Sequence, residues 1–589
     1  MLKIFFDAIS LAREKWNMLF ADAEELHEHL HRVLELLLEL LLFLILPRLI
    51  QRAHLGAHCR NLRLQFGIEA VQVRGESAHF GWINDGFRHG CGSDRQYYGF
   101  TVSNWSISLH TSPCLIDGRL VTDCDGDLLD VRNPATDTIV GRVPMCSAAT
   151  AASAADAAVR AFDSWKRTTA AERARLLRSV AARVRADRDV FAKTITLECG
   201  KPILEARGEV EYSATFFDAA ASAGELLEGS IIASRIADRR VFAVREALGA
   251  TMAVTPWNFP LAMIARKVGP ALAAGCTQVV KPSEETPLSA SLLAECMIAC
   301  GIPNGVFNVV TGDAVTVVGA LLAHTGIRKL SFTGSTEVGC ILARQASERL
   351  VKCALELGGN APFIVFADAD LARAADQLIA AKFRFMGQTC ISANRVFVER
   401  SVLAQFTALI ETRMDALTMG DPMDERTRIG PLINDDAIAK VERHVRDAVA
   451  QGARLRRGGK VASLEGLSRR FFEPTLLDGG ASTMACSCEE TFGPVLVLHA
   501  FDTEAEVIAS ANAVASGLAA YVMTQDSDRL WRVVEQIDAG VIGANDGAPS
   551  AAEAPFGGFK DSGYGKEGGR IGVEEYTRVK YVSMRVRGA

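Results

Sequence analysis

Apolar and polar positions follow a regular pattern from about residue 114 of this 589-residue chain onward. Four apolar runs each end in a polar loop, and helical segments separate them: Ala250 to Pro260, Cys276 to Pro287, Gly305 to Gly312 and Ile327 to Gly339. Repeated strand, loop and helix units predict a doubly wound parallel sheet. Ligands bind beyond the carboxyl ends of such strands, so we expect the loops with Asn258, Lys281 and Ser335 to line one cleft.

Other stretches add detail to this α/β pattern. An Ala- and Arg-rich region predicts helix from about residue 149 to 197, and one helix has a start signal at Thr286-Pro287 and a stop signal at Gly301. The stretch "GYGKEG" near the C-terminus fits G-x-G-x-x-G, but no apolar strand precedes it. We therefore interpret it as a glycine-rich loop and not as a dinucleotide-binding turn.

The first fifth of the chain differs from the rest in amino-acid composition. Eight of the eleven histidines precede residue 111, and no lysine lies between Lys15 and Lys166. Its most apolar stretch, Val33 to Pro47, carries two glutamates and is shorter than the roughly 20 residues of a bilayer span. We predict a helix or helical pair over about 1–50 and irregular chain to about 110. Three interpretations of this N-terminal segment are open: a membrane-surface anchor, a partner-binding helix, or a segment that is not part of the mature domain. We favour the last of these.

Composition excludes several classes of function. The chain is 49% apolar and 23% charged with a net charge of −6, and no run of like charges follows residue 110. We expect neither nucleic acid nor a membrane as partner. The cysteines form no CxxC pair and no Cys/His cluster at zinc spacing, and Cys486 and Cys488 lack a second pair. Reduced thiols, a cytoplasmic location and no bound metal are therefore expected.

Four groups would suffice to oxidise an aldehyde with a nicotinamide cofactor. A thiol with a lowered pKa adds to the carbonyl, and two hydrogen-bond donors hold the oxyanion. A carboxylate then activates water against the thioester, and a further site orients the cofactor. Cys390 in "GQTC", Asn258 in "TPWNFP" and Glu356 in "LELGGN" are the candidates, with the Cys390 backbone N–H as second donor. Each alone is also explained by packing, a turn or a surface charge.

Six motifs in order, "TPWNFP", "VVKPSEETP", "SFTGSTEVG", "LELGGNAPFIVF", "GQTC" and "EETFGPV", resemble the aldehyde dehydrogenase superfamily from about Cys114 to the end. The resemblance is strongest to succinate-semialdehyde dehydrogenases. It implies that Cys390 is the nucleophile, Glu356 the general base and Asn258 the oxyanion donor. It also implies a set of cofactor-binding residues: Pro256, Trp257, Lys281, Ser283, Glu284, Gly334, Ser335, Glu490 and Phe492.

The fold implied by this resemblance has a doubly wound cofactor domain, an α/β catalytic domain and a β oligomerisation arm. We expect the cofactor domain at 112–356 and the catalytic domain at 357–570, after an atypical extension at 1–111. The arm combines a hairpin at about 231–250 with a C-terminal strand in 571–589. A homodimer or homotetramer follows from such an arm.

Two choices within the family rest on physical chemistry. Glu284 would accept hydrogen bonds from ribose hydroxyls but repel a 2′-phosphate, so NAD is favoured over NADP. Glu356 favours hydrolysis to a free acid, because relatives that transfer the acyl group to coenzyme A typically lack this base. The expected product is an acid.

Two arginines and a serine predict the substrate. Arg266, Arg384 and Ser550 resemble the carboxylate site of succinate-semialdehyde dehydrogenases, and guanidinium groups bind carboxylates strongly. We expect oxidation of succinate semialdehyde, or a similar short ω-carboxy aldehyde, through a thiohemiacetal and a thioester. Glutarate semialdehyde, a broad aldehyde range, or a non-catalytic scaffold recruited by the N-terminal helices are the alternatives.

Departures from the subfamily pattern surround the expected nucleophile. Ser392 stands where many members have a second cysteine, so a disulfide switch at that place is not expected. Phe385 and Met386 replace smaller or polar residues and predict a bulkier or shifted pocket.

Overall fold

The computed structural model describes residues 111–124 and 126–587. The predicted helices of residues 1–50, the irregular chain after them and their proposed anchoring role lie outside the described residues. Within the described ranges, no helix is both long and apolar enough for a membrane crossing.

The first sheet has the strand order β2-β1-β9-β8-β7-β10-β11-β21. The strands from β9 to β11 pair in parallel, as the repeated pattern predicted. The bounds are β1 (Cys114–Ile116), β2 (Arg119–Val121), β7 (Ala250–Val254), β8 (Thr277–Lys281), β9 (Phe307–Val309), β10 (Ile327–Thr333), β11 (Lys352–Glu356) and β21 (Gly563–Tyr564).

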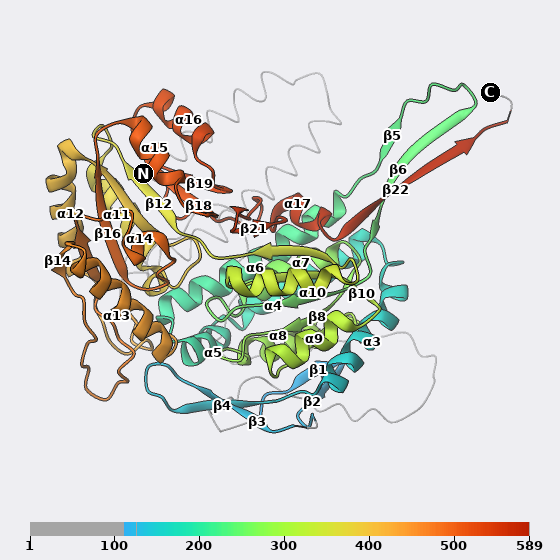
Figure 1. The fold of residues 1–589 in the computed structure, drawn as a ribbon. Helices are drawn as coiled ribbons and strands as arrows, with labels where there is room; N and C mark the ends of the chain where they lie inside the picture. The colour runs from blue at the N-terminus through green and yellow to red at the C-terminus, as the bar shows by residue number, and fades with distance from the viewer. Residues whose placement is uncertain (1–110, 125, 588–589) are drawn as a thin grey trace, which may run out of the picture. The chain divides into compact units, whose positions relative to one another are not determined.

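Helices cover both faces of this sheet (Figure 1). Alternate strand residues face opposite sides, so Ala253 and Val280 join one core while their neighbours Met252 and Val279 join another. The region predicted as helix from 149 to 197 divides into three helices. The bounds are α3 (Ala148–Trp165), α4 (Ala170–Ala186), α5 (Arg188–Cys199), α6 (Ile203–Glu225), α7 (Ala262–Ala273), α8 (Leu288–Ala299), α9 (Ala314–Ala323), α10 (Thr336–Ser347) and α17 (Gly569–Glu574).

A second sheet has the order β14-β15-β16-β13-β12-β18-β19 and is parallel except at the β14–β15 pair. Its strands are β12 (Ala361–Val365), β13 (Ala393–Glu399), β14 (Arg454–Arg457), β15 (Thr475–Asp478), β16 (Val495–Phe501), β18 (Ala519–Met523) and β19 (Val541–Ala544). Its helices are α11 (Leu371–Phe383), α12 (Leu403–Asp415), α13 (Asp435–Ala450), α14 (Ala485–Cys488), α15 (Glu504–Asn512) and α16 (Ser527–Gln536).

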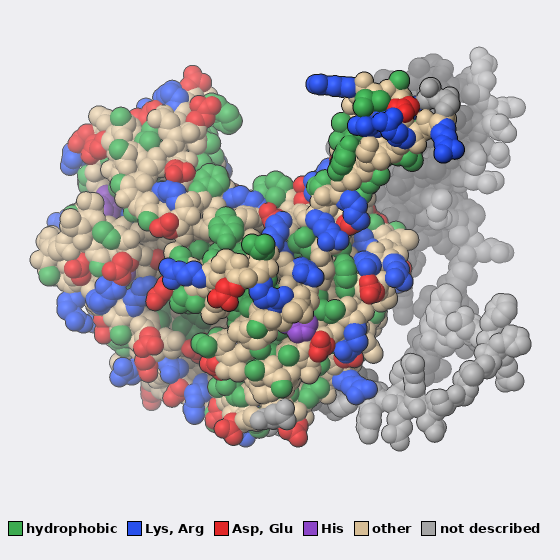
Figure 2. Space-filling view, turned by 45° about the vertical axis from the view of Figure 1, so that its right-hand side comes forward, with side chains coloured by type: hydrophobic (Ala, Val, Ile, Leu, Met, Phe, Trp, Pro, Cys, Tyr) green, Lys and Arg blue, Asp and Glu red, His purple; other side chains and the backbone are tan. Residues whose placement is uncertain are grey.

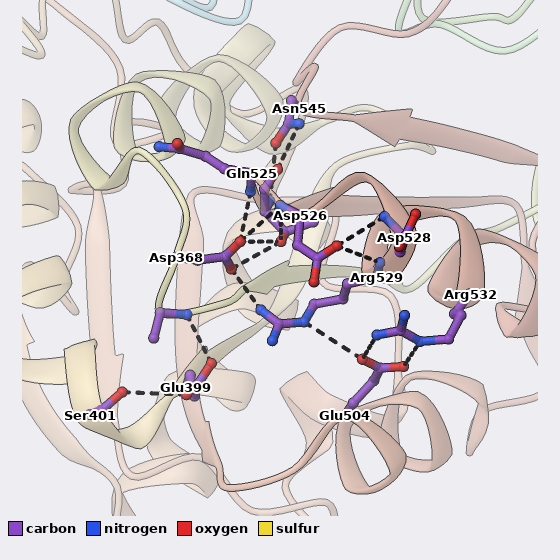
Figure 3. A network of polar contacts seen from close by, with 12 residues as sticks. Asp368, Glu399, Ser401, Glu504, Gln525, Asp526, Asp528, Arg529, Arg532 and Asn545 are labelled. Atoms are coloured by element: carbon purple, nitrogen blue, oxygen red, sulfur yellow. Dashed lines mark hydrogen bonds and ion pairs between the residues drawn. The ribbon is translucent and has the colours of Figure 1, made fainter.

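Polar contacts join the loops at one end of this second sheet (Figure 3). Asp368, after β12, accepts hydrogen bonds from Thr524 after β18 and from Arg529 on α16. Arg529 also approaches Glu504 on α15, which Arg532 binds through two nitrogens. This network fixes the neighbouring strand ends and helices relative to one another.

A three-stranded antiparallel arm extends away from the two sheets (Figure 1). It consists of β5 (Ser230–Ile232), β6 (Arg239–Ala247) and β22 (Thr577–Arg585), with β6 in the middle. The hairpin and C-terminal strand expected from the sequence are thus paired with each other. Figure 2 shows hydrophobic and basic side chains along the arm. Two smaller pairs complete the strands, β3 (Leu128–Arg132) with β4 (Ile139–Pro144) and β17 (Ser516–Gly517) with β20 (Phe559–Lys560).

The glycine-rich loop near the C-terminus packs against the first sheet. Gly563 pairs with Glu356 in β11, and its φ of +108° lies in a region that L side chains rarely adopt. A Cβ on Gly563 would lie 1.9 Å from the Leu355 carbonyl oxygen. Glycine is therefore required here for close approach to β11 and not for a dinucleotide-binding turn.

Candidate active site

The side chains predicted to line one cleft all follow parallel strands of the first sheet. Asn258 lies after β7, Lys281 ends β8 and Ser335 follows β10, and β7 pairs in register with both β8 and β10. Their strands therefore end at the same edge of the sheet, which is where ligands of doubly wound sheets bind.

Cys390 lies between a turn at Arg384–Gly387 and β13, and it is half-buried. Burial raises the pKa of its thiol to about 12, and the nearby Glu490 and Glu356 carboxyls also raise it. Arg266 opposes them by lowering this pKa. The expectation of a lowered pKa is therefore wrong for this state of the site, because two acids and burial outweigh one cation.

A left-handed turn precedes Cys390. Phe385, Met386 and Gly387 have φ values of +46°, +54° and +73°. The Phe385 ring packs edge-on against Trp257, and the Met386 sulfur accepts the Gly430 N–H. Both side chains are fully buried and lie outside the pocket beside Cys390. They therefore affect that pocket through the course of the backbone and not by filling it.

Asn258 is buried, and its amide Nδ2 donates to the Gln388 carbonyl, two residues before Cys390, at 3.0 Å. Lys201 donates to the Asn258 carbonyl at 2.8 Å and pairs with the buried Glu209. Glu209 also accepts the backbone N–H groups of Leu261 and Ala262 at the start of α7. No spacing in the sequence reveals this buried pair, although it fixes the loop that carries Asn258.

Glu356 ends β11 and is buried, and both carboxyl oxygens lack hydrogen-bond partners among the described residues. Burial raises the pKa of this carboxyl well above its usual value, and the nearby Glu567 raises it further. Arg266, Lys267 and Lys566 act in the opposite direction. A buried carboxyl with a raised pKa and no fixed hydrogen-bond partner is suited to exchange protons with water or a thiol.

The predicted cofactor residues lie along the ends of the first sheet and on the facing loops. The buried Lys281 amine is 2.5 Å from a Glu284 carboxylate oxygen, beside the half-buried Ser283. Ser335 caps α10 by accepting the Val338 N–H, and the Gly334 N–H donates to the Glu356 carbonyl. Acceptors and donors of this kind fit the hydroxyl and phosphate groups of a dinucleotide.

A second part of this set faces Cys390 from another loop. Glu490 accepts the Gly359 N–H at 3.0 Å, and burial raises its pKa to about 7. The Phe492 ring lies edge-on to Trp257 at 5.4 Å, and Pro256 precedes this tryptophan in the chain. A half-buried carboxyl and an aromatic ring fit a ribose and a planar heterocycle.

Arg266, Arg384, Ser550 and Cys390 line one pocket. The Arg266 Nε lies 2.7 Å from a Glu567 oxygen, and its Nη2 has no hydrogen-bond partner among the described residues. The pocket is completed by Tyr212, Phe259, Met263, Thr389, Ile391 and Phe556. Sequence reasoning missed Tyr212, whose hydroxyl lies 2.5 Å from the Ser550 hydroxyl, because a lone tyrosine on an apolar helix carries no motif.

The fold and this pocket define an α/β enzyme whose site presents a thiol, a buried carboxyl and an amide. A model described as the aldehyde dehydrogenase family matches residues 121–582. The chain therefore belongs to the aldehyde dehydrogenase family, and it oxidises aldehydes with a nicotinamide dinucleotide.

Individual relatives are similar over nearly their whole length. Succinate-semialdehyde dehydrogenase (NADP(+)) GabD of Escherichia coli (strain K12) is 46% identical over 477 residues, which are 81% of this chain and 98% of that protein. A glutarate-semialdehyde dehydrogenase of Pseudomonas putida is 44% identical over 471 residues, 80% of this chain and 97% of that one. The crystal structure of an E. coli NADP-dependent enzyme aligns with a TM-score of 0.80 and 46% identity, covering 81% and 99% of the two chains.

Proposed function

We propose that this protein oxidises succinate semialdehyde, or a similar short ω-carboxy aldehyde, to the dicarboxylic acid with NAD. The observation that carries the substrate assignment is the pocket shared by Cys390, Arg266, Arg384 and Ser550. Two guanidinium groups beside the thiol complement a carboxylate at the far end of a short aldehyde. The similarity to succinate- and glutarate-semialdehyde dehydrogenases supports the same substrate class.

In this proposal each site residue has one role. The Cys390 sulfur adds to the aldehyde carbon, while the Asn258 amide and the Cys390 N–H hold the oxyanion. The bound nicotinamide supplies a hydride acceptor. Glu356 then takes a proton from the water that hydrolyses the thioester. Arg266 favours the thiolate, because its charge is the one that lowers the Cys390 pKa.

The Arg384→Leu variant tests the substrate assignment. Arg384 is the better choice because Arg266 is also paired with the buried Glu567, so removing Arg266 would disturb the fold. We expect the variant to lose about 2–4 kcal/mol of transition-state stabilisation. The kcat/KM for succinate semialdehyde should therefore fall roughly 30- to 1,000-fold. The value for butanal, which has the same chain length without the carboxylate, should hardly change.

Arg400→Leu is the matched control, because Arg400 is exposed and bound to Asp502 outside the pocket. A kcat/KM for succinate semialdehyde that hardly changes in Arg384→Leu would instead support a broad-specificity aldehyde dehydrogenase. Comparing succinate with glutarate semialdehyde in the parent enzyme determines the preferred chain length, an alternative favoured by the Pseudomonas putida relative.

NAD preference is proposed from the charge beside the expected ribose site. The Glu284 carboxylate is paired with Lys281 and is about one-third exposed, so it would repel a 2′-phosphate. Glu284→Gln should therefore raise kcat/KM for NADP relative to NAD by about tenfold or more, measured by NAD(P)H absorbance. The neighbouring exposed Glu285→Gln is the control. A parent enzyme that prefers NADP, like its relative from E. coli, would contradict the proposal.

A homodimer or homotetramer joined through the three-stranded arm is also proposed. Apolar side chains exposed on that arm support it. The cytoplasmic location and the domain boundaries at residues 111, 356 and 570 stay predictions.

A further inference from the structure

Three cysteines that are distant in the sequence meet at the edge of the first sheet, away from the catalytic thiol. Cys114 starts β1, Cys124 lies in the loop after β2, and Cys146 lies just before the N-cap of α3. All three are buried, and their sulfur atoms lie within 4.8 Å of one another. The sequence predicted no metal because Cys114 and Cys146 are 32 residues apart and form no spacing motif.

We propose that Cys114, Cys124 and Cys146 bind one soft d10 metal ion, Cu(I) in preference to Zn(II). With metal–sulfur bonds of about 2.3 Å, three sulfurs around one ion lie about 4.0 Å apart. The Cys114 and Cys146 sulfurs are 3.3 Å apart and the third is within 4.8 Å, so small side-chain movements suffice. Binding releases the thiol protons to solvent and changes no oxidation state.

The donor set determines which metal is favoured. Among the described residues the cluster contains only thiols, with no histidine or carboxylate. Zn(II) in structural sites takes four ligands of nitrogen, sulfur or carboxylate oxygen, whereas soft thiolates select Cu(I). The Thr311 hydroxyl lies 3.2 Å from the Cys114 sulfur, and it donates its hydrogen to the Pro144 carbonyl. Three sulfurs without a strong fourth ligand therefore favour Cu(I).

The surroundings hold the sulfurs in place. The Thr311 N–H donates to the Cys114 sulfur at 3.4 Å, and the Cys146 N–H donates to the Thr311 carbonyl. Cys146 also lies at the positive N-terminal end of the 18-residue α3. Exposed neighbours of Cys124, Asp123 and Gly126, give the ion a short route from solvent. Outer-shell contacts of this kind orient metal ligands in known sites.

Metal binding to the full-length protein tests the proposal. A Cys390→Ser background removes the catalytic thiol, and Cu(I) is titrated anaerobically against a coloured chelator such as bicinchoninate. We expect one equivalent of Cu(I), bound at least about 100-fold more weakly in Cys124→Ala and Cys146→Ala. Cys296→Ala is the matched control, because Cys296 is a buried cysteine beside another thiol, Cys300. This substitution should leave Cu(I) binding unchanged.

Two further measurements keep the test independent of how well the variants fold. Copper X-ray absorption should report three sulfur neighbours, and Cu(I) should protect Cys114, Cys124 and Cys146 of the unmutated protein from alkylation, read by mass spectrometry. Equal Cu(I) binding in the cluster variants, or a loss in the control, would overturn the site. Stoichiometric Zn(II) in place of Cu(I) would overturn the three-coordinate assignment. A Cys114–Cys146 disulfide formed with peroxide, together with no metal binding, would replace the metal site by a redox pair.

Discussion

Glu356 is a buried carboxyl group whose two oxygens find no hydrogen-bond donor among the described residues. Leaving such a group without partners destabilises a folded protein, and its ionised form is disfavoured further by the nearby Glu567. The site therefore keeps Glu356 mainly protonated at low pH and lets it act as a base only as the pH rises. A group that is costly to stability and unpaired has the properties of a catalytic acid or base.

Glu356→Gln should reveal both properties. Activity of the parent should rise with pH as Glu356 ionises, whereas the variant should lose about 10²- to 10⁴-fold in kcat and show no such rise. The folded-state pKa lies above the unfolded value, so the folded chain retains a proton that the unfolded chain releases. Stability is therefore lost as pH rises through the folded pKa, and Glu356→Gln should become more stable than the parent at alkaline pH.

Chemical denaturation and steady-state rates, measured from about pH 5 to about pH 9, separate the two effects. Glu295→Gln is the matched control, because burial also raises the pKa of Glu295, which lies on α8 outside the pocket. It should share the stability change but leave kcat unaltered. A pH-rate profile of Glu356→Gln that parallels the parent would contradict the assignment of this base.

The element that positions Cys390, the proposed nucleophile, is the left-handed turn of Phe385, Met386 and Gly387. Non-glycine residues in this conformation cost roughly 1–2 kcal/mol each, and such strain persists only where the surroundings hold it. Here the surroundings are the Phe385 contact with Trp257 and the Met386 contact with Gly430. The turn therefore depends on tight packing against the loops that carry Asn258 and Gly430.

Gly387→Ala tests this packing. A Cβ on Gly387 would lie 2.4 Å from the Gly493 carbonyl oxygen, next to Phe492, so the loop that carries Cys390 must move. We expect a loss of about 2–4 kcal/mol in unfolding free energy, with a lower kcat and a higher KM for the cofactor. Gly466→Ala is the control, because Gly466 has the same φ of +73° with nothing within 4 Å, and it should cost only about 1 kcal/mol. Equal losses in the two variants would mean that conformation alone, and not the contact, matters.

The local pattern of apolar and polar residues predicted the helices and strands well. Contacts between residues that are distant in the sequence could not be predicted from it. Strands β7 and β8 are buried along their whole length, as the strands of a sheet covered on both faces must be, and family motifs begin near their carboxyl ends. The Arg266–Glu567 pair and the Cys390 pKa depend on which residues meet in space. Residues about 300 positions apart leave no periodic signal in a single sequence. The three-cysteine cluster was missed because its members, up to 32 positions apart, follow no metal-binding spacing motif.

At the scale of the whole molecule, the three-stranded arm exposes several large apolar side chains to solvent. Ile231 is 85% exposed, and Val579 and Tyr581 are each 62% exposed. The two outer strands, β5 and β22, also have one unpaired edge each within the described part of the chain. Exposed apolar edges of this kind favour pairing with another chain, which supports the proposed oligomer.

The double variant Val579→Glu, Tyr581→Glu should separate the subunits. Two carboxylates on β22 would have to be buried without partners in an interface, which costs several kcal/mol, so dissociation is favoured. Light scattering after size exclusion should show an oligomer for the parent and a monomer for the variant at micromolar concentration. Val315→Glu is the control, because Val315 is 82% exposed on α9, away from the arm. This variant should remain oligomeric. A parent that is monomeric, or a double variant with unchanged mass, would contradict the oligomerisation role of the arm.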